Sequence, residues 1–225
     1  VMKVLVLFIA MVCAIACTTT ETILDFNLVE GSINKLDSAY VIFQEQAYRF
    51  PLDAQGKGTL KMNIKEDGFA ILVYGKLSTN IYLKQGNTLK VIWDKEDWRG
   101  GKMQVVSDDG GINEYIRLNI EKSFKKATEC SFTLEEDSFM DKVEQTIREL
   151  SAGIDSTNFA PEIKDILKAS SKYEVLYWIY KYPRFHNFGK RMSQEEYLAF
   201  KRFNEYMFDK FEAHPEYLCL TAYRE

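Results

Sequence analysis

The hydrophobic period of this 225-residue chain changes at Asp108-Asp109-Gly110-Gly111. Before this point apolar and polar side chains alternate, as from Leu60 to Ile64, in short segments divided by Gly, Asn and Asp turns. After it apolar side chains recur every three or four residues, as from Ile112 to Phe124. Alternation is typical of half-buried antiparallel strands, and the longer period is typical of amphipathic helices. The sequence therefore predicts an α+β fold, with an antiparallel β-sandwich-like domain over residues 22–107 and an all-α helical domain over residues 108–225.

Capping signals set the expected boundaries inside the helical part. Thr133 with Glu136 matches a capping box, in which each side chain binds the other residue's exposed backbone N–H. Gly153 is placed to end the helix that follows. Ser193 with Glu196 is a second capping box, and it predicts one helix continuing to Phe211.

Prolines mark the other expected boundaries. Pro161 suits the first position of a helix that continues or restarts through Ile179, and Pro183 is expected to terminate it. Pro215 is expected to open a last helix. Because no stop signal closes that helix before Glu225, we expect the helical domain to be truncated at its C-terminal end.

The N-terminal stretch predicts where the chain is sent. Lys3 precedes an unbroken apolar run from Val4 to Cys13, which small residues follow. Because a membrane-spanning helix needs about 20 apolar residues, this run is too short, and we interpret residues 1–16 as a signal peptide. Two cleavage patterns are open. Ala14-Ile15-Ala16 suits an ordinary signal peptidase, and the same residues with Cys17 resemble a bacterial lipobox.

We expect the second pattern, although Ala14 stands where that motif usually has leucine. Cys17 is then the lipidated first residue, and residues 17–21 form a tether to the membrane. Thr18 and Thr19 contain no acidic retention signal of the kind associated with the inner membrane. We therefore expect an exported protein, anchored in the cell envelope on the outer rather than the inner membrane.

The charge balance argues against a nucleic-acid partner. The chain has 29 Lys and Arg against 33 Asp and Glu, a net charge of −4 that becomes −5 when Lys3 leaves with the signal peptide. No basic stretch is concentrated enough to neutralise a phosphate backbone, so we expect no nucleic-acid partner.

Two cysteines follow the proposed anchor. An exported compartment permits a disulfide between Cys130 and Cys219, which would close a loop of about 90 residues and contribute about 4 kcal/mol. The alternative is a pair of buried thiols, because cysteine packs as a small hydrophobe.

Three stretches of the β part carry a resemblance to a known family. They are Phe26-x-Leu28-x-x-Gly31-x-Ile33, Asp53-x-x-Gly56-Lys57 and Ile81-Tyr82-Leu83-x-x-Gly86-x-x-Leu89. From Phe26 to about Trp93 the chain resembles exported lipoproteins of Bacteroidetes. In those proteins a β-rich domain of unknown function and a helical segment precede a thioredoxin-like domain of periplasmic thiol-disulfide oxidoreductases.

The resemblance implies a non-catalytic docking portion of such a redox system, with a thioredoxin-like domain in cis or in trans as its partner. The catalytic W-C-x-x-C motif of the family lies in the thioredoxin domain, and this sequence contains no C-x-x-C. No catalytic residue is therefore carried over to this chain.

Aromatic and cationic side chains are unusually dense between Tyr173 and Phe211. Within that region we predict a loop over residues 182–191, whose rings no helical period explains. The candidate ligand-binding residues are Tyr182, Phe185, His186 and Phe188. Exposed rings beside cations suit a sugar face or a partner protein, which favours a stand-alone glycan- or protein-binding lipoprotein as the alternative function. The structural alternative is a packed seam between helices.

No residue pattern indicates catalysis, a cofactor or a metal. Gly56-Lys57-Gly58 lacks the third glycine and the following helix of a dinucleotide loop, so it indicates a hairpin turn. The two histidines, His186 and His214, lie in separate segments without the i, i+4 spacing of a metal site. We expect no cofactor, no metal and no catalytic residue in this chain.

Overall fold

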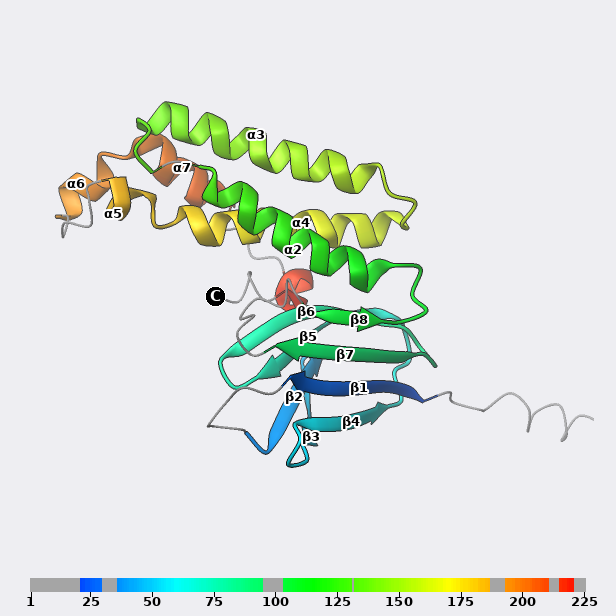
Figure 1. The fold of residues 1–225 in the computed structure, drawn as a ribbon. Coiled ribbons are helices and arrows are strands. Elements are labelled where there is room, and N and C mark those ends of the chain that lie inside the picture. Colours follow the sequence, from blue (N-terminus) through cyan, green and yellow to red (C-terminus); the bar gives the residue numbers. More distant parts are fainter. Residues whose placement is uncertain are drawn as a thin grey trace, which may run out of the picture.

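The computed structural model describes residues 21–29, 36–94, 103–130, 132–186, 193–210 and 215–220. In these ranges a β-sandwich is followed by a layer of helices, and Figure 1 shows the helices stacked on one side of the sandwich. The predicted α+β fold, with its N-terminal β part and C-terminal helical part, is confirmed.

The sandwich consists of two four-stranded sheets. The first sheet has the order β4 (Lys57–Met62), β1 (Thr22–Val29), β7 (Thr88–Asp94) and β8 (Gln104–Val106). The second has the order β3 (Gln46–Pro51), β2 (Ser38–Phe43), β5 (Gly68–Tyr74) and β6 (Leu77–Leu83). Neighbouring strands are antiparallel except β1 and β7, which are parallel.

Strict alternation along β1 shows why these residues form a strand. Leu24, Phe26 and Leu28 point into the sandwich and are buried, whereas the residues between them face outward. The ring of Phe26 meets Phe50 and Trp93 edge-on, with centroids 6.0 and 6.4 Å away. Each such buried side chain contributes about 1.5–3 kcal/mol by leaving water, so this core holds the two sheets together.

Among the described residues, the helical layer contains three long helices and several short ones. They are α2 (Ile112–Thr128), α3 (Glu136–Asp155), α4 (Pro161–Ile179), α5 (Tyr182–His186), α6 (Gln194–Leu198), α7 (Lys201–Lys210) and the 3₁₀ helix η1 (Pro215–Cys219). In Figure 1, α3 forms the outermost layer, and α5, α6 and α7 gather at one end.

The helices pack on the outer face of β5 and β6. Phe69 and Tyr82 stand on that face and join a cluster with Ile112 and Ile116 of α2 and Leu167 of α4. This apolar contact buries the face of the second sheet that would otherwise meet water, so the helical layer is part of the same packed body as the sandwich.

Several expected boundaries are wrong. Thr133 is not the N-cap of the helix that follows: α3 begins at Glu136 with Glu135 as its N-cap, and the Glu136 carboxylate accepts a hydrogen bond from the backbone N–H of Phe203 at 2.8 Å. Gly153 lies inside α3 instead of ending it. Residues 182–186, which the sequence predicts as part of a loop, form helix α5. Pro183 is accommodated there because it lies in the first turn, where a missing N–H is tolerated.

Two other boundary predictions are confirmed, and two are correct only in part. Pro161 begins α4, which runs unbroken to Ile179. The Ser193–Glu196 capping box is present at α6. The single helix expected after it is divided, because α6 ends at Leu198 and α7 begins at Lys201. Pro215 does open an element, but that element is a short 3₁₀ helix.

Candidate functional site

Tyr182 is fully buried, unlike a ligand-binding ring. It stacks on Phe139 with ring centroids 3.9 Å apart, and its hydroxyl donates to the Leu134 carbonyl at 2.8 Å. Burial, followed by the nearby Glu136 and Glu135 carboxylates, raises the pKa of Tyr182 to about 12. Tyr182, predicted as a ligand-binding residue, therefore ties α5 to α3 in the structure.

His186 has the same structural role. Its Nδ1 lies 3.1 Å from the Phe132 carbonyl, and because a carbonyl can only accept, Nδ1 carries the proton. Its ring packs between Tyr182 and Phe200, with centroid distances of 5.1 and 5.7 Å. The contacts leave His186 half-buried and hold α5 against the start of α7.

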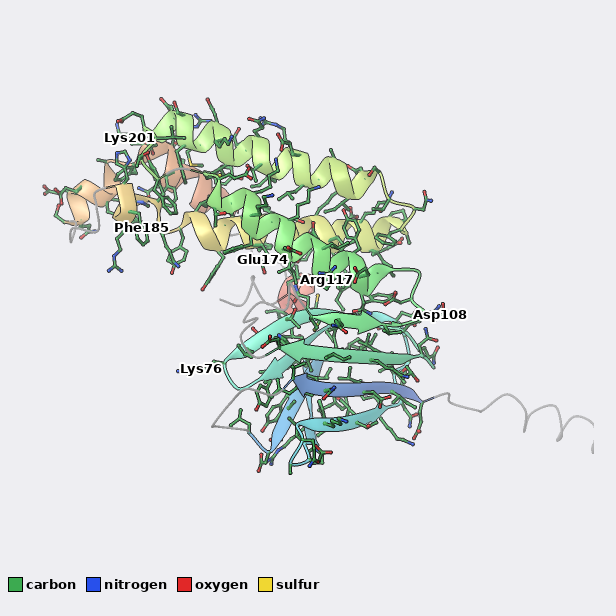
Figure 2. The ribbon with its side chains drawn as sticks, in the orientation of Figure 1. Lys76, Asp108, Arg117, Glu174, Phe185 and Lys201 are labelled. Carbon is green, nitrogen blue, oxygen red and sulfur yellow. The ribbon has the colours of Figure 1, made fainter. Side chains whose placement is uncertain are left out.

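Phe185 is the predicted site residue that the structure leaves open to solvent. It is 49% exposed, and one face stacks on Phe132 with centroids 5.4 Å apart at 18°. Figure 2 shows Phe185 at the end of the helical layer where α5 and α6 lie. The fourth candidate, Phe188, lies outside the described residues.

Three further exposed side chains come from elements at this end of the helical layer, Tyr180 from the C-cap of α4 and Tyr197 and Leu198 from α6. Together with Phe185 they define the distal group, whose members are between 43% and 54% exposed: Tyr180, Phe185, Tyr197 and Leu198. The sequence pattern does not mark Tyr197 or Leu198 as exposed, because both fall within the period of one long amphipathic helix. Large exposed apolar side chains that gather in one region are typical of an interaction surface.

Helix α6 forms without burying any of its residues. Its capping box supplies two hydrogen bonds, Glu196 N–H to Ser193 Oγ at 3.2 Å and Ser193 N–H to Glu196 Oε2 at 2.7 Å. The short helix is therefore held by its cap and by the chain on either side, and it presents Tyr197 and Leu198 outward.

The two described cysteines are not joined by a disulfide in the structure. Cys130 is buried, with its Sγ 3.8 Å from the Lys126 carbonyl and 3.9 Å from Thr146 Oγ1. Burial raises the pKa of the Cys130 thiol, the opposite of what a nucleophilic cysteine needs. Cys219 is half-buried at the end of η1.

An acidic hollow of about 270 Å³ lies where the β2–β3 turn, the β4–β5 turn and η1 meet. Three carboxylates line it, from Glu45, Glu66 and Asp67. Glu66 accepts from the Gln44 amide, and Asp67 accepts from the Gln85 backbone N–H, both at 2.7 Å. The carboxylates of Glu66 and Asp67 therefore have a structural role, because they stabilise the turns around the hollow.

The described residues offer no grouping suited to a metal ion, since no three His, Cys, Asp or Glu side chains converge among them. None of the described helices is long and apolar enough to cross a membrane. Cys17, the predicted lipidation site, lies outside the described residues. No protein-family model, characterised protein or solved structure matches the chain.

Proposed function

We propose that this chain is a membrane-anchored lipoprotein of the cell envelope that docks a partner protein through the distal group. In this proposal it is the non-catalytic docking portion of a thioredoxin-like thiol-disulfide oxidoreductase system. The observation that carries the proposal is the exposure of Phe185, Tyr197 and Leu198 at one end of the helical layer. Aromatic side chains on a rigid support are the usual anchors of protein interfaces.

The packing beneath the distal group supports this role. Phe185 rests on Phe132, and the neighbouring Tyr182 is fixed by Phe139 and by the Leu134 carbonyl. A surface whose side chains are already ordered loses less conformational entropy when it binds. Phe185, the member of the distal group that rests on this packing, is therefore already ordered for contact with an apolar surface of a partner.

The position of β1 also supports the proposal. Thr22 begins β1 at the right-hand end of the sandwich in Figure 1, whereas α5 and α6 lie at the opposite end of the helical layer. Cys17 precedes Thr22 by five residues, which span at most about 18 Å when fully extended. A lipid on Cys17 would hold the β1 end near the membrane and direct the distal group away from it.

The partner would supply the redox chemistry. The thiol of Cys130 is buried with a raised pKa, and this chain has no C-x-x-C. The order of a β part followed by helices agrees with the order that the family resemblance implies. The size of the native protein in the membrane fraction distinguishes a thioredoxin-like domain in cis from one in trans.

The test separates anchoring from docking. Cys17→Ala should abolish labelling by a radioactive fatty acid and release the protein from the membrane fraction. Phe185→Ala with Tyr197→Ala should leave labelling intact and abolish crosslinking to a thioredoxin-like protein in intact cells. The matched control is Leu118→Ala, which removes a side chain on α2 that is 46% exposed. Equal crosslinking by the double variant and the control would contradict docking by the distal group.

A second candidate function is capture of a glycan at the same end. Lys181 Nζ lies 5.7 Å from the Tyr177 ring and 5.6 Å from the exposed Tyr180 ring, and a cation beside aromatic faces suits a sugar. If a neutral oligosaccharide binds the full chain and Phe185→Ala with Phe188→Ala abolishes that binding, this candidate replaces protein docking.

A further inference from the structure

No described helix covers the outer face of the first sheet. The helices cover the outer face of β5 and β6 in the second sheet, and none of the helices labelled in Figure 1 lies across β4, β1 and β7. A hollow of about 330 Å³ lies over these three strands. It is lined on its outward side by Asp25, Asn27, Lys57, Thr59, Lys90 and Ile92.

Two lysines flank the hollow from opposite sides of the central strand. Lys57 of β4 pairs in register with Asn27, and Lys90 of β7 pairs with Asp25. The two lysines are separated by two strand spacings across the sheet and by two residues along the strands, which places their Cα atoms about 12 Å apart. Lysine side chains are long enough for both ammonium groups to reach one anion above β1.

The charge on these lysines is not balanced within the described residues. Neither Lys57 nor Lys90 has a carboxylate within ion-pair distance there, whereas Lys61, on the same face, pairs with Glu21 at 3.1 Å. Asp25 accepts a hydrogen bond from Thr59 Oγ1 at 3.0 Å. The hollow therefore combines two cations with a single anion.

The remaining groups define the ligand further. The Asn27 amide, the Thr59 hydroxyl and the Asp25 carboxylate suit the hydroxyl groups of a sugar, and Ile92 offers an apolar contact for a ring face. The Asp25 carboxylate repels a multiply charged phosphate, which favours a ligand with one negative charge on each unit.

We propose that the outer face of the first sheet binds a carboxylated glycan, with a uronate-type carboxylate between Lys57 and Lys90. Because no described helix crosses these three strands, the face leaves room for the glycan chain to continue on either side of the bound sugar. This site lies on the sandwich, whereas the proposed docking surface lies on the helical layer, so the inference is independent of the proposed function.

The experiment measures binding of oligogalacturonate to the full chain in detergent by isothermal titration calorimetry. Lys57→Gln and Lys90→Gln should each weaken binding by about tenfold, the loss of one charge-assisted contact. Binding should also weaken as the salt concentration rises. The matched control is Lys61→Gln, whose ammonium group is already paired with Glu21, and it should change the affinity by less than about twofold.

Specific outcomes would overturn the inference. They are absence of oligogalacturonate binding, equal binding of its methyl ester, complete competition by inorganic phosphate, or an equal loss in Lys61→Gln. The variant Phe185→Ala with Tyr197→Ala should bind oligogalacturonate normally while losing its protein partner. Failure of glycan binding and failure of protein docking are thus distinguishable.

Discussion

The side-chain amide of Asn113 in α2 makes both hydrogen bonds that a neighbouring strand would make to Tyr82 in β6. Tyr82 N–H donates to Asn113 Oδ1 at 2.8 Å, and Asn113 Nδ2 donates to the Tyr82 carbonyl at 2.7 Å. Asp109 accepts from Asn113 Nδ2 and from the N–H groups of Ile112 and Asn113. Helix α2 thereby closes the edge of the second sheet. Asp109, two residues before the N-cap of α2, caps the first turn of that helix.

Asn113→Ala should destabilise the junction between sandwich and helices. It leaves the buried N–H and carbonyl of Tyr82 without their partner, and each such group costs about 1–3 kcal/mol. We expect a loss of about 2–4 kcal/mol in the free energy of unfolding, measured by urea denaturation. Hydrogen exchange of the Tyr82 amide should become faster in the same variant.

Asn119→Ala is the control for that variant. Asn119 lies on the same helix but donates to Ser171 of α4 at 2.6 Å, within the helical layer. It should also lower stability, yet leave hydrogen exchange at Tyr82 unchanged under native conditions. Equal acceleration of that amide in both variants would show that Asn113 has no specific role at the strand edge.

Tyr182→Phe should destabilise the helical layer while keeping its packing. The ring stays against Phe139, but the Leu134 carbonyl loses its donor. The expected loss is about 1 kcal/mol, read as a lower urea midpoint with an unchanged m-value. An unchanged midpoint would mean that water replaces the phenol hydroxyl at that carbonyl without cost.

Stability should fall at alkaline pH because one buried and one half-buried phenol resist ionisation. Burial is the main cause that raises the pKa of Tyr182 and Tyr206 to about 12. In the unfolded chain these phenols ionise near pH 10. Their contribution is therefore fully present below about pH 10 and is lost as the pH rises from about 10 to 12.

The double variant Tyr182→Phe with Tyr206→Phe should show a shallower fall in the free energy of unfolding across that range. Some slope remains, because burial also raises the pKa of Tyr82 and Tyr115. A slope identical to that of the unmodified chain would contradict the assignment to Tyr182 and Tyr206.

Two glycine substitutions should change stability in opposite directions. A Cβ at Gly58 would lie 2.5 Å from the Pro51 carbonyl oxygen, so Gly58→Ala should push β3 and β4 apart and cost about 1–3 kcal/mol. A Cβ at Gly153 in α3 meets only Lys122 Nζ at 3.4 Å, so Gly153→Ala should stabilise the helix by about 0.5–1 kcal/mol. Thermal denaturation of the two variants compares the signs directly.

Cys130 should react with iodoacetamide only when the protein opens. Its thiol is buried and its pKa is raised by burial, so the thiolate is scarce and inaccessible. Mass spectrometry should show modification of Cys130 in the absence of reductant once urea unfolds the chain. If modification required a reductant first, Cys130 would be oxidised in the isolated protein.

The sequence predicts the fold class well because burial follows its periodicity. In β1 every second side chain is buried, and in α2 Ile112, Ile116 and Ile120 share the face that meets the sandwich. The turn at Gln44-Glu45 cannot be recognised from the sequence, because both residues have a positive φ, at 49° and 63°, without the glycine or asparagine that usually marks such a turn.

The candidate sites are harder to predict because they depend on contacts between distant segments. Aromatic density drew attention to Tyr182 and Phe185, yet only the packing of Phe139 and Phe132 shows that the first is buried and the second exposed. Lys57 and Lys90 carry no motif. They flank one hollow only because β1 lies between β4 and β7, antiparallel to the first and parallel to the second.

The central position of β1 in its sheet has a mechanical consequence. A tension applied to the chain upstream of Thr22 pulls this strand along its own axis, between β4 on one side and β7 on the other. Hydrogen bonds that lie across the pulling direction are strained together and cannot be opened one after another. A pulling force on this end of the chain therefore acts on a strand whose hydrogen bonds to both neighbours resist shear together.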